Sequence, residues 1–141
     1  MTVAQPDMLG ASARDVVMPL VPMFHANCWS LAHCVPMVGG ALVLPGARLD
    51  GASVHELLEA EKVTCAAAVP TVWLMLLEHL EATGGRLSTL KRVLIGGSAV
   101  PRVMIQKFRE NYDVEVIHAW GMTEMSPIGT VCSMKAELAD L

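Results

Sequence analysis

The run Trp120-Gly121-Met122-Thr123-Glu124 combines residue types that could bind a phosphorylated ligand. A glycine lets the backbone pass close to a ligand, a threonine hydroxyl can bond a phosphate oxygen, and a carboxylate can hold Mg²⁺ that bridges phosphates. The aromatic face of Trp120 could also stack on a base. Taken alone, the five residues fit an ordinary turn at a strand end, with an exposed Thr-Glu pair, better than a ligand site, so a functional interpretation depends on the rest of the chain.

Two other segments carry groups that could contact the same ligand. Gly96-Gly97-Ser98-Ala99 follows an apolar run and leads into a helical pattern, so its backbone N–H groups could face an anion or a nucleotide. The alternative is a tight turn in which Pro101 opens the helix. The third segment, residues 22–29, places His25 and Trp29 where a strand gives way to a helix; by themselves these two fit ordinary core or cap residues.

The elements that must position these segments alternate between strands and helices. Continuous apolar runs predict strands over residues 16–23, 41–44, 65–69, 93–95 and 114–117, with a last short strand behind. Helical patterns lie between them, over residues 27–38, from Ser53, over 72–80 and from Pro101. Ser53 and Glu56 match the Ser-x-x-Glu capping box, which predicts the start of the second helix.

Strands this apolar, separated by helices, predict an α/β fold with a mostly parallel sheet and helices on both faces. In such sheets, ligands bind at the carboxyl ends of the strands. All three segments described above follow predicted strands, so we expect them to meet at that edge.

Composition restricts the other classes of function. The chain has 141 residues, 53% of them hydrophobic and ten of them methionine, which predicts one core within a segment of a larger body. Its net charge is −4 and its ten Lys and Arg are scattered, so we expect no nucleic-acid partner. No apolar run reaches the roughly 18 residues of a transmembrane helix, and the N-terminus does not resemble a signal peptide. We therefore expect a cytoplasmic location.

The irregular spacing of Cys28, Cys34, Cys65 and Cys132 favours reduced, buried thiols.

Taken together and in order, the motifs resemble those of acyl-CoA synthetases of the adenylate-forming enzyme superfamily, closest to the medium- and long-chain fatty-acid branch. The matching runs are PMFHxNxW at 22–29, VLPG at 43–46, VPTVW at 69–73, GGSA at 96–99 and HAWGMTEMSP at 118–127. The resemblance covers residues 13–131. It implies that a fatty acid is joined to AMP with release of pyrophosphate, and that the acyl group then passes to the thiol of coenzyme A.

The resemblance also implies roles for single residues. Glu124 would ligate Mg²⁺, Thr123 would contact phosphate, and His25 would stand near the reacting carboxylate. Trp29 matches a tryptophan that gates the fatty-acid tunnel in related enzymes. The remaining nucleotide-site residues would be Gly97, Ser98, Ala99, His118, Ala119, Trp120, Gly121 and Met122. The wider family usually has tyrosine at position 120, so tryptophan keeps the stacking face and loses a hydroxyl.

The resemblance further implies what lies outside residues 1–141. The family's Ser/Thr/Gly-rich phosphate loop should precede this segment, and its ribose-binding aspartate and small, lysine-bearing C-terminal domain should follow it. We therefore expect residues 1–141 to be one α/β segment, a partial large N-terminal AMP-binding domain that is inactive alone. The resemblance also implies a possible homodimer, and a lipid substrate could bring the protein to a membrane surface.

Four alternatives stay open at this point. A serine hydrolase would use Ser98, Asp113 and His118, but the last two would lie roughly 16 Å apart on an extended strand. A zinc module would use His25, Cys28, His33 and Cys34, whose spacing fits no common finger and for which we expect no zinc. A non-enzymatic scaffold piece could self-associate through apolar faces. An adenylate-forming ligase could instead act on a non-fatty carboxylate.

Overall fold

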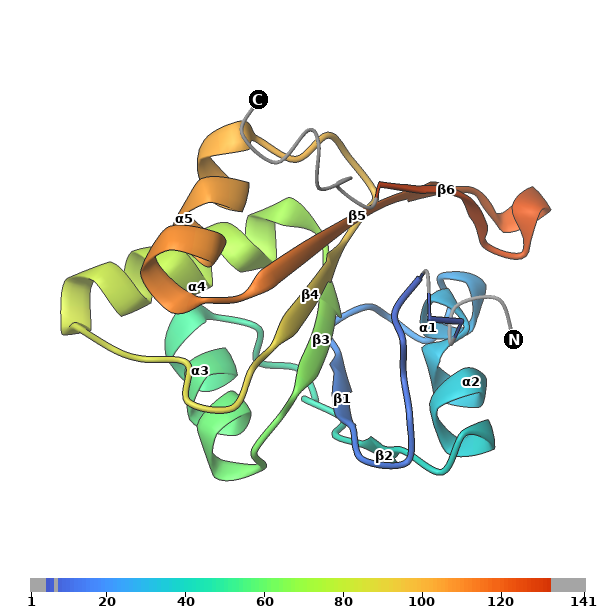
Figure 1. The fold of residues 1–141 in the computed structure, drawn as a ribbon, viewed down its shortest axis with the longest axis horizontal. Coiled ribbons are helices and arrows are strands. Elements are labelled where there is room, and N and C mark those ends of the chain that lie inside the picture. The colour runs from blue at the N-terminus through green and yellow to red at the C-terminus, as the bar shows by residue number, and fades with distance from the viewer. Residues whose placement is uncertain (1–4, 7, 133–141) are drawn as a thin grey trace.

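A computed structural model describes residues 5–6 and 8–132 of the chain. Its centre is a six-stranded sheet in the order β2-β1-β3-β4-β5-β6 (Figure 1). The first five strands in this order run parallel to one another, and β6 pairs antiparallel with β5. The strands are β1 (Val16–Pro19), β2 (Ala41–Leu42), β3 (Cys65–Ala68), β4 (Arg92–Ile95), β5 (Glu115–Gly121) and β6 (Ile128–Cys132). The predicted α/β fold is confirmed, with several strands shorter than expected.

Helices cover the two faces of the sheet unequally. In Figure 1, α3 (Gly51–Ala60), α4 (Pro70–Thr83) and α5 (Arg102–Tyr112) lie on one side of the sheet, and α2 (Leu31–Met37) lies on the other. The core is accordingly divided into two clusters, one between the sheet and α3 to α5, the other between the sheet and α2. Alternate residues of β3 contribute to each cluster, and all four are fully buried, as the apolar run predicted.

The three-helix face is anchored by aromatic packing and by a close helix contact. Trp73 of α4 meets Phe108 of α5 edge to face, with ring centroids 5.5 Å apart and planes at 90°. At the start of α3, a Cβ atom on Gly51 would collide with the carbonyl oxygen of Met75 in α4. The glycine therefore allows α3 and α4 to approach closely at this point.

The second helix begins earlier than the capping box predicted. Its N-cap is Asp50, whose carboxylate accepts hydrogen bonds from the Ser53 backbone N–H at 3.0 Å and from the Ser53 hydroxyl at 2.8 Å. Ser53 is therefore inside the first turn, and the prediction that Ser53 and Glu56 form the cap is wrong. Asp50 is an equally favoured cap residue placed three positions earlier.

The predicted single helix over residues 27–38 is also wrong. Residues 26–30 instead form a left-handed turn, with φ between 44° and 65° at all five non-glycine positions. This turn contains α1 (Ala26–Trp29), and the right-handed helix α2 begins only after Ser30. Each such residue costs roughly 1–2 kcal/mol relative to a right-handed conformation, so the surrounding structure must hold the turn in place.

A polar cluster fixes the amino ends of the central strands. Asp15 accepts hydrogen bonds from Ser12, from the Thr64 hydroxyl at 2.8 Å and from the Arg92 guanidinium at 2.8 Å. Burial by itself raises the pKa of Asp15, but the hydrogen bonds from Thr64 and Ser12 and the charge of Arg92 outweigh it, so the pKa lies below its ordinary value. Beside this cluster, burial raises the pKa of the Cys65 thiol to about 12.

The prediction of reduced, buried thiols holds for three of the four cysteines. All four cysteines are free; three are buried as predicted, whereas Cys132 is exposed, because it ends the edge strand β6.

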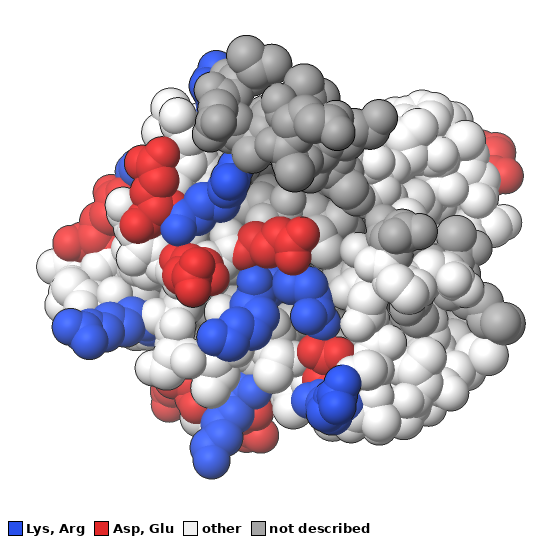
Figure 2. Space-filling model, viewed as in Figure 1, with Lys and Arg blue, Asp and Glu red and all other residues white. Residues whose placement is uncertain are grey.

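In the view of Figure 2, charges of both signs intermingle over the half that contains α3 to α5, and few lie over the half that contains α2 and β6. Within the described part of the chain, no helix is long and apolar enough to cross a membrane.

Candidate functional site

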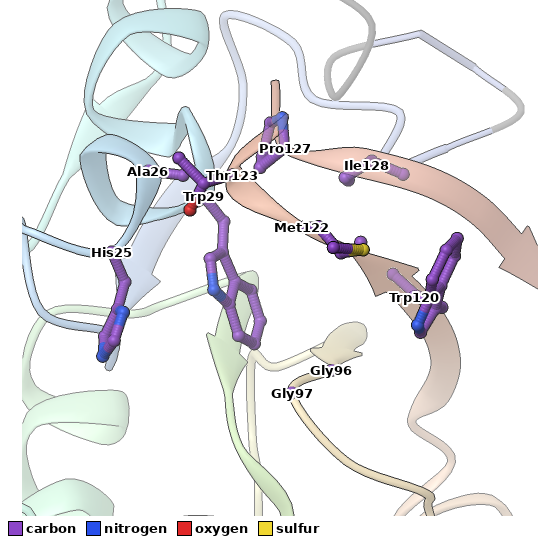
Figure 3. Close-up of a pocket in the computed structure, with 12 residues that line it drawn as sticks. His25, Ala26, Trp29, Gly96, Gly97, Trp120, Met122, Thr123, Pro127 and Ile128 are labelled. Atoms are coloured by element: carbon purple, nitrogen blue, oxygen red, sulfur yellow. The ribbon is translucent and has the colours of Figure 1, made fainter. Parts of the chain in front are cut away.

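A pocket lies at the carboxyl ends of β4 and β5, where parallel topology brings the three candidate segments together (Figure 3). Its volume is about 160 Å³. Ligand pockets for drug-sized molecules are roughly 300–1,000 Å³, so this one can hold only part of a nucleotide or of an acyl group. Its lining residues are His25, Ala26, Trp29, Gly96, Gly97, Ala119, Trp120, Gly121, Met122, Thr123, Pro127 and Ile128.

The floor of the pocket is glycine backbone beneath an indole ring. A Cβ atom on Gly96 would lie 3.3 Å from Cη2 of Trp29 and 3.0 Å from the carbonyl oxygen of Ala119. Gly97 has φ +82°, and a Cβ atom there would stand 3.1 Å from Val69. Two glycines are therefore required, one by close packing and the other also by its backbone conformation.

The left-handed turn places the side chains of His25 and Trp29 on the opposite wall of the pocket. Cys28, in the middle of the turn, is buried, and its thiol donates a hydrogen bond to the Val21 carbonyl 2.8 Å away, just beyond β1. This bond ties the turn to the centre of the sheet. Trp29 extends from the turn over Gly96, and His25 precedes it at the pocket mouth, with its ring centroid 4.5 Å from that of Phe24 (Figure 3).

The remaining wall is the connection between β5 and β6. Residues 118–121 were expected just past a strand, but β5 continues through Gly121, so Trp120 and Gly121 project from strand positions. A Cβ atom on Gly121 would collide with the Pro127 carbonyl, which explains the glycine at this crossing of β5 and β6. Thr123 begins a 3₁₀ turn over Thr123–Met125, so its side chain stands at the pocket while the chain turns back.

Most of the predicted site residues line the pocket, and four do not. His25, Trp29, Gly97, Ala119, Trp120, Gly121, Met122 and Thr123 are brought together. Ser98 and Ala99 are exposed beyond Gly97, where the chain leaves the pocket towards α5. His118 is half-buried in β5, and Glu124 is exposed in the 3₁₀ turn next to Thr123. These four lie beside the pocket along the chain but outside its lining.

Four lining residues were missed: Ala26, Gly96, Pro127 and Ile128. Ala26, Gly96 and Pro127 lie in segments already singled out, so their position in those segments was a signal that could have found them. Ile128 lies beyond these segments and reaches the pocket through the pairing of β6 with β5, for which there is no local sequence signal.

The polar groups at the pocket suit an anionic ligand accompanied by a hard cation. Among the lining residues that the structure describes, His25 is the only ionisable side chain. The Thr123 hydroxyl and the adjacent exposed Glu124 carboxylate supply oxygen donors. Mg²⁺ prefers oxygen ligands and commonly takes one or two carboxylates together with substrate phosphates, so the residues present fit that ion without a complete protein cage.

The geometry does not favour a hydrolase or a zinc module. Asp113 ends α5 before β5 begins, at the amino edge of the sheet, whereas Ser98 follows β4 at the carboxyl edge. Among the described residues, no group of three or more His, Cys, Asp or Glu could hold a metal. The buried Cys28 thiol is engaged with Val21, while His25 and His33 are exposed.

Sequence comparison identifies similar proteins across the chain. The family model for AMP-binding enzymes matches residues 1–140. The chain is 51% identical over its full length to a medium-chain-fatty-acid–CoA ligase of Ectopseudomonas oleovorans. It is also 50% identical over 96% of its length to a long-chain-fatty-acid–CoA ligase of Thermus thermophilus, and 50% identical over 88% to a 3-methylmercaptopropionyl-CoA ligase of Ruegeria pomeroyi. It spans 26%, 25% and 23% of these three relatives, respectively.

Solved structures have the same fold. A long-chain-fatty-acid-CoA ligase from Archaeoglobus fulgidus superposes with a TM-score of 0.76 at 26% identity, covering 87% of this chain and 26% of that one. The O-succinylbenzoate coenzyme A synthetase from Bacillus subtilis, solved with ATP and a magnesium ion, gives 0.76 at 26% identity, covering 89% and 25%. The arrangement of strands and helices described above therefore recurs in longer chains, of which the match covers about a quarter.

Proposed function

The chain belongs to the family of AMP-binding enzymes, and we propose on that premise that it forms part of the active site of a fatty-acid–CoA ligase. The observation that carries the proposal is identity of 51% and 50% with medium- and long-chain fatty-acid–CoA ligases across essentially the whole chain. Eight of the twelve motif residues that the resemblance assigns to the site also line one pocket.

In the proposed reaction, a carboxylate oxygen of the fatty acid attacks the α-phosphorus of ATP, and the bond from that phosphorus to pyrophosphate breaks. The acyl-adenylate then reacts with the thiolate of coenzyme A, which attacks the acyl carbon and displaces AMP. In both steps an anionic nucleophile, first the carboxylate and then the thiolate, approaches a group that carries negatively charged phosphate. A site for them needs donors for phosphate oxygens and an apolar path for the chain, and the pocket has both kinds of wall.

The nucleotide belongs on the β4 and β5 side in this proposal. Trp120, 53% exposed and in the pocket lining, offers its ring face to adenine, and the backbone beyond Gly97 lies alongside. Thr123 donates its hydroxyl to a phosphate oxygen. Glu124 would hold the Mg²⁺ that accompanies ATP, and that ion would neutralise phosphate charge. Ser98, Ala99 and His118 would contact the nucleotide from positions next to the pocket.

The acid belongs on the opposite side, against the left-handed turn. His25 at the mouth can donate a hydrogen bond to the carboxylate, and the indole of Trp29 is an apolar surface for the adjoining chain. Because the pocket is only about 160 Å³, other segments must complete the acyl path. For the same reason we propose that the 141-residue polypeptide alone does not turn over; acid-dependent pyrophosphate release from it would contradict this.

A second substrate class has a specific observation in its favour. The chain is 50% identical to 3-methylmercaptopropionyl-CoA ligases, whose name specifies a small sulfur-containing acid. Identity therefore does not separate a fatty chain from a short thioether acid. The chemistry of adenylation would be the same for both, and only the depth and lining of the acyl path would differ.

The decisive experiment measures pyrophosphate release by the longest natural polypeptide that contains this chain, with ATP, Mg²⁺ and coenzyme A. The acids would form a fatty-acid series from short to long chains, with 3-methylmercaptopropionate beside it. A maximum within the fatty series supports the first proposal, and a maximum at the thioether acid supports the second. Activity indifferent to all of these acids would contradict both.

The sequence-based expectations that the parent protein forms a homodimer and is located in the cytoplasm remain predictions.

A further inference from the structure

Two histidines face each other on the far side of the sheet from α2, well outside the pocket lining. His55 of α3 and His79 of α4 bring Nδ1 and Nε2, respectively, to 3.3 Å. The ring centroids are 5.3 Å apart and the ring planes cross at 60°, so the rings meet only along one edge. Both side chains are half-buried, which leaves the pair accessible to solvent ions.

The other nitrogen of His55 determines which ring nitrogens carry protons. Nε2 of His55 lies 2.9 Å from the Arg86 carbonyl oxygen. A carbonyl only accepts, so Nε2 of neutral His55 must carry the proton and its Nδ1 must present a lone pair. That lone pair is directed at His79, whose Nε2 consequently donates its proton to His55 when nothing else is bound.

The loop after α4 holds His55 in this orientation. A Cβ atom on Gly85 would lie 2.8 Å from Cε1 of His55, so the glycine lets the loop pass close to the imidazole where it is, with the Arg86 carbonyl presented to it. Histidines that bind metals typically donate their second ring N–H to a carbonyl or carboxylate, which fixes the tautomer and the ring orientation. His55 already has this arrangement.

The spacing of the two facing nitrogens matches tetrahedral coordination. With Zn–N bonds of about 2.0–2.1 Å, two ligands at the tetrahedral angle stand about 3.3–3.4 Å apart. The observed separation is 3.3 Å. A hydrogen bond between imidazoles accounts for the contact without metal, but it does not require the second nitrogen of His55 to be fixed by a carbonyl.

We propose that His55 and His79 form a two-imidazole site for a late transition-metal ion such as Zn²⁺, with water in the remaining positions. On binding, the Nε2 proton of His79 moves through solvent to its Nδ1, so both rings stay neutral and each supplies one lone pair. The ion links α3 to α4. Imidazole nitrogen favours Zn²⁺, Ni²⁺ and Cu²⁺ over Mg²⁺, so this site is chemically distinct from the oxygen donors at Thr123 and Glu124.

The test titrates Zn²⁺ into the metal-free, longest natural polypeptide that contains this chain, by calorimetry, beside its His79→Gln variant. Glutamine keeps a donor for Nδ1 of His55 but removes the imidazole ligand. We expect the wild type to bind one more zinc ion per chain than the variant, or to bind that ion at least tenfold more tightly. With Co²⁺ in place of Zn²⁺, we expect a tetrahedral absorption band in the wild type that His79→Gln lacks.

The matched control is His33→Gln, because His33 is an exposed histidine outside the pair. It should bind zinc as the wild type does. His55→Gln should lose the site as His79→Gln does, and the unfolding midpoint without metal shows whether each variant is folded. Equal stoichiometry and affinity in the wild type and both pair variants would overturn the proposal, as would a loss that His33→Gln shares.

Discussion

The indole of Trp29 lies so close to Gly96 that a Cβ atom on the glycine would stand 3.3 Å from ring carbon Cη2. Trp29 comes from a left-handed turn between β1 and α2, and Gly96 follows β4, so the contact joins two segments that are distant in the sequence. The position of the indole, and with it one wall of the pocket, therefore depends on the absence of a side chain at Gly96.

Replacing this glycine should impair use of the acid. In Gly96→Ala, the new methyl group meets the Ala119 carbonyl at 3.0 Å and Trp29 at 3.3 Å, so the indole must shift. Overpacking costs about 1–3 kcal/mol of folding stability; if displacement of the indole costs binding of the acid as much, kcat/KM for the fatty acid falls roughly 5- to 150-fold. Pyrophosphate release at varied acid concentration measures this loss of kcat/KM. The control is Gly46→Ala: its φ of +70° makes alanine cost some stability, but no atom lies within 4 Å of the new Cβ, so the folded variant should keep kcat/KM.

The left-handed turn predicts an unusual order of substitutions at Asn27. Its φ is 54°, a conformation that glycine adopts without steric cost and that a β-branched residue strongly disfavours. Asn27→Val should lower the free energy of unfolding by about 1–2 kcal/mol relative to Asn27→Gly. Urea unfolding of the two variants measures the difference.

Gln106 is the control for this order, because it is exposed in the middle of the right-handed helix α5. There valine should be tolerated better than glycine, since glycine is the poorer helix former by several tenths of a kcal/mol. The same order at Asn27 and Gln106 would contradict the left-handed assignment.

The sequence predicted the sheet well because its central strands are unambiguous. Cys65–Ala68 is short, continuous and apolar, and all four residues are fully buried between two helical layers. Parallel topology then explains why Gly97 and Trp120 were expected at one edge. The left-handed turn could not be predicted, because residues 26–30 contain no glycine and fit a right-handed apolar helix equally well.

The parts of the site that were missed depend on tertiary contacts. Ser98 and Ala99 share a motif with Gly97, but the chain has already turned towards α5 when it reaches them. Ile128 becomes a wall residue only through antiparallel pairing of β6 with β5. A motif therefore identifies the part of the chain at which a site forms, whereas the path of the backbone decides which of its residues face the pocket.

Asp15 should make stability dependent on pH. Its pKa is held below the ordinary value, chiefly by hydrogen bonds from Thr64 and Ser12 and by Arg92, which together overcome the effect of burial. A lowered pKa in the folded state means that the ionised group stabilises the fold above the unfolded-state pKa of about 3.9. This stability is lost as the pH falls through the folded-state pKa.

Asp15→Asn should therefore lower the free energy of unfolding at pH 7 by about 3 kcal/mol, because it leaves the partly buried Arg92 without its counter-charge. The difference from the wild type should shrink as the pH drops below 4, since the wild-type carboxylate becomes neutral as well. Urea unfolding across this pH range provides the measurement. A difference that stays constant with pH would show that Asp15 acts through packing or hydrogen-bond geometry alone.

Glu124→Gln tests the proposed magnesium role with little change of shape. The carboxylate is exposed in the 3₁₀ turn directly after Thr123, and the amide removes its negative charge while it keeps its volume. If this carboxylate holds the Mg²⁺ of the nucleotide, kcat should fall on the order of 100-fold and half-maximal activity should need more Mg²⁺. Glu115→Gln is the matched control, because Glu115 is also exposed but lies at the opposite end of β5, and it should retain both values. Pyrophosphate release across a Mg²⁺ titration distinguishes the two variants. Unchanged kcat and Mg²⁺ dependence in Glu124→Gln would show that Glu124 is not part of the metal site. The assignment of the acid-binding wall would not be affected by that result.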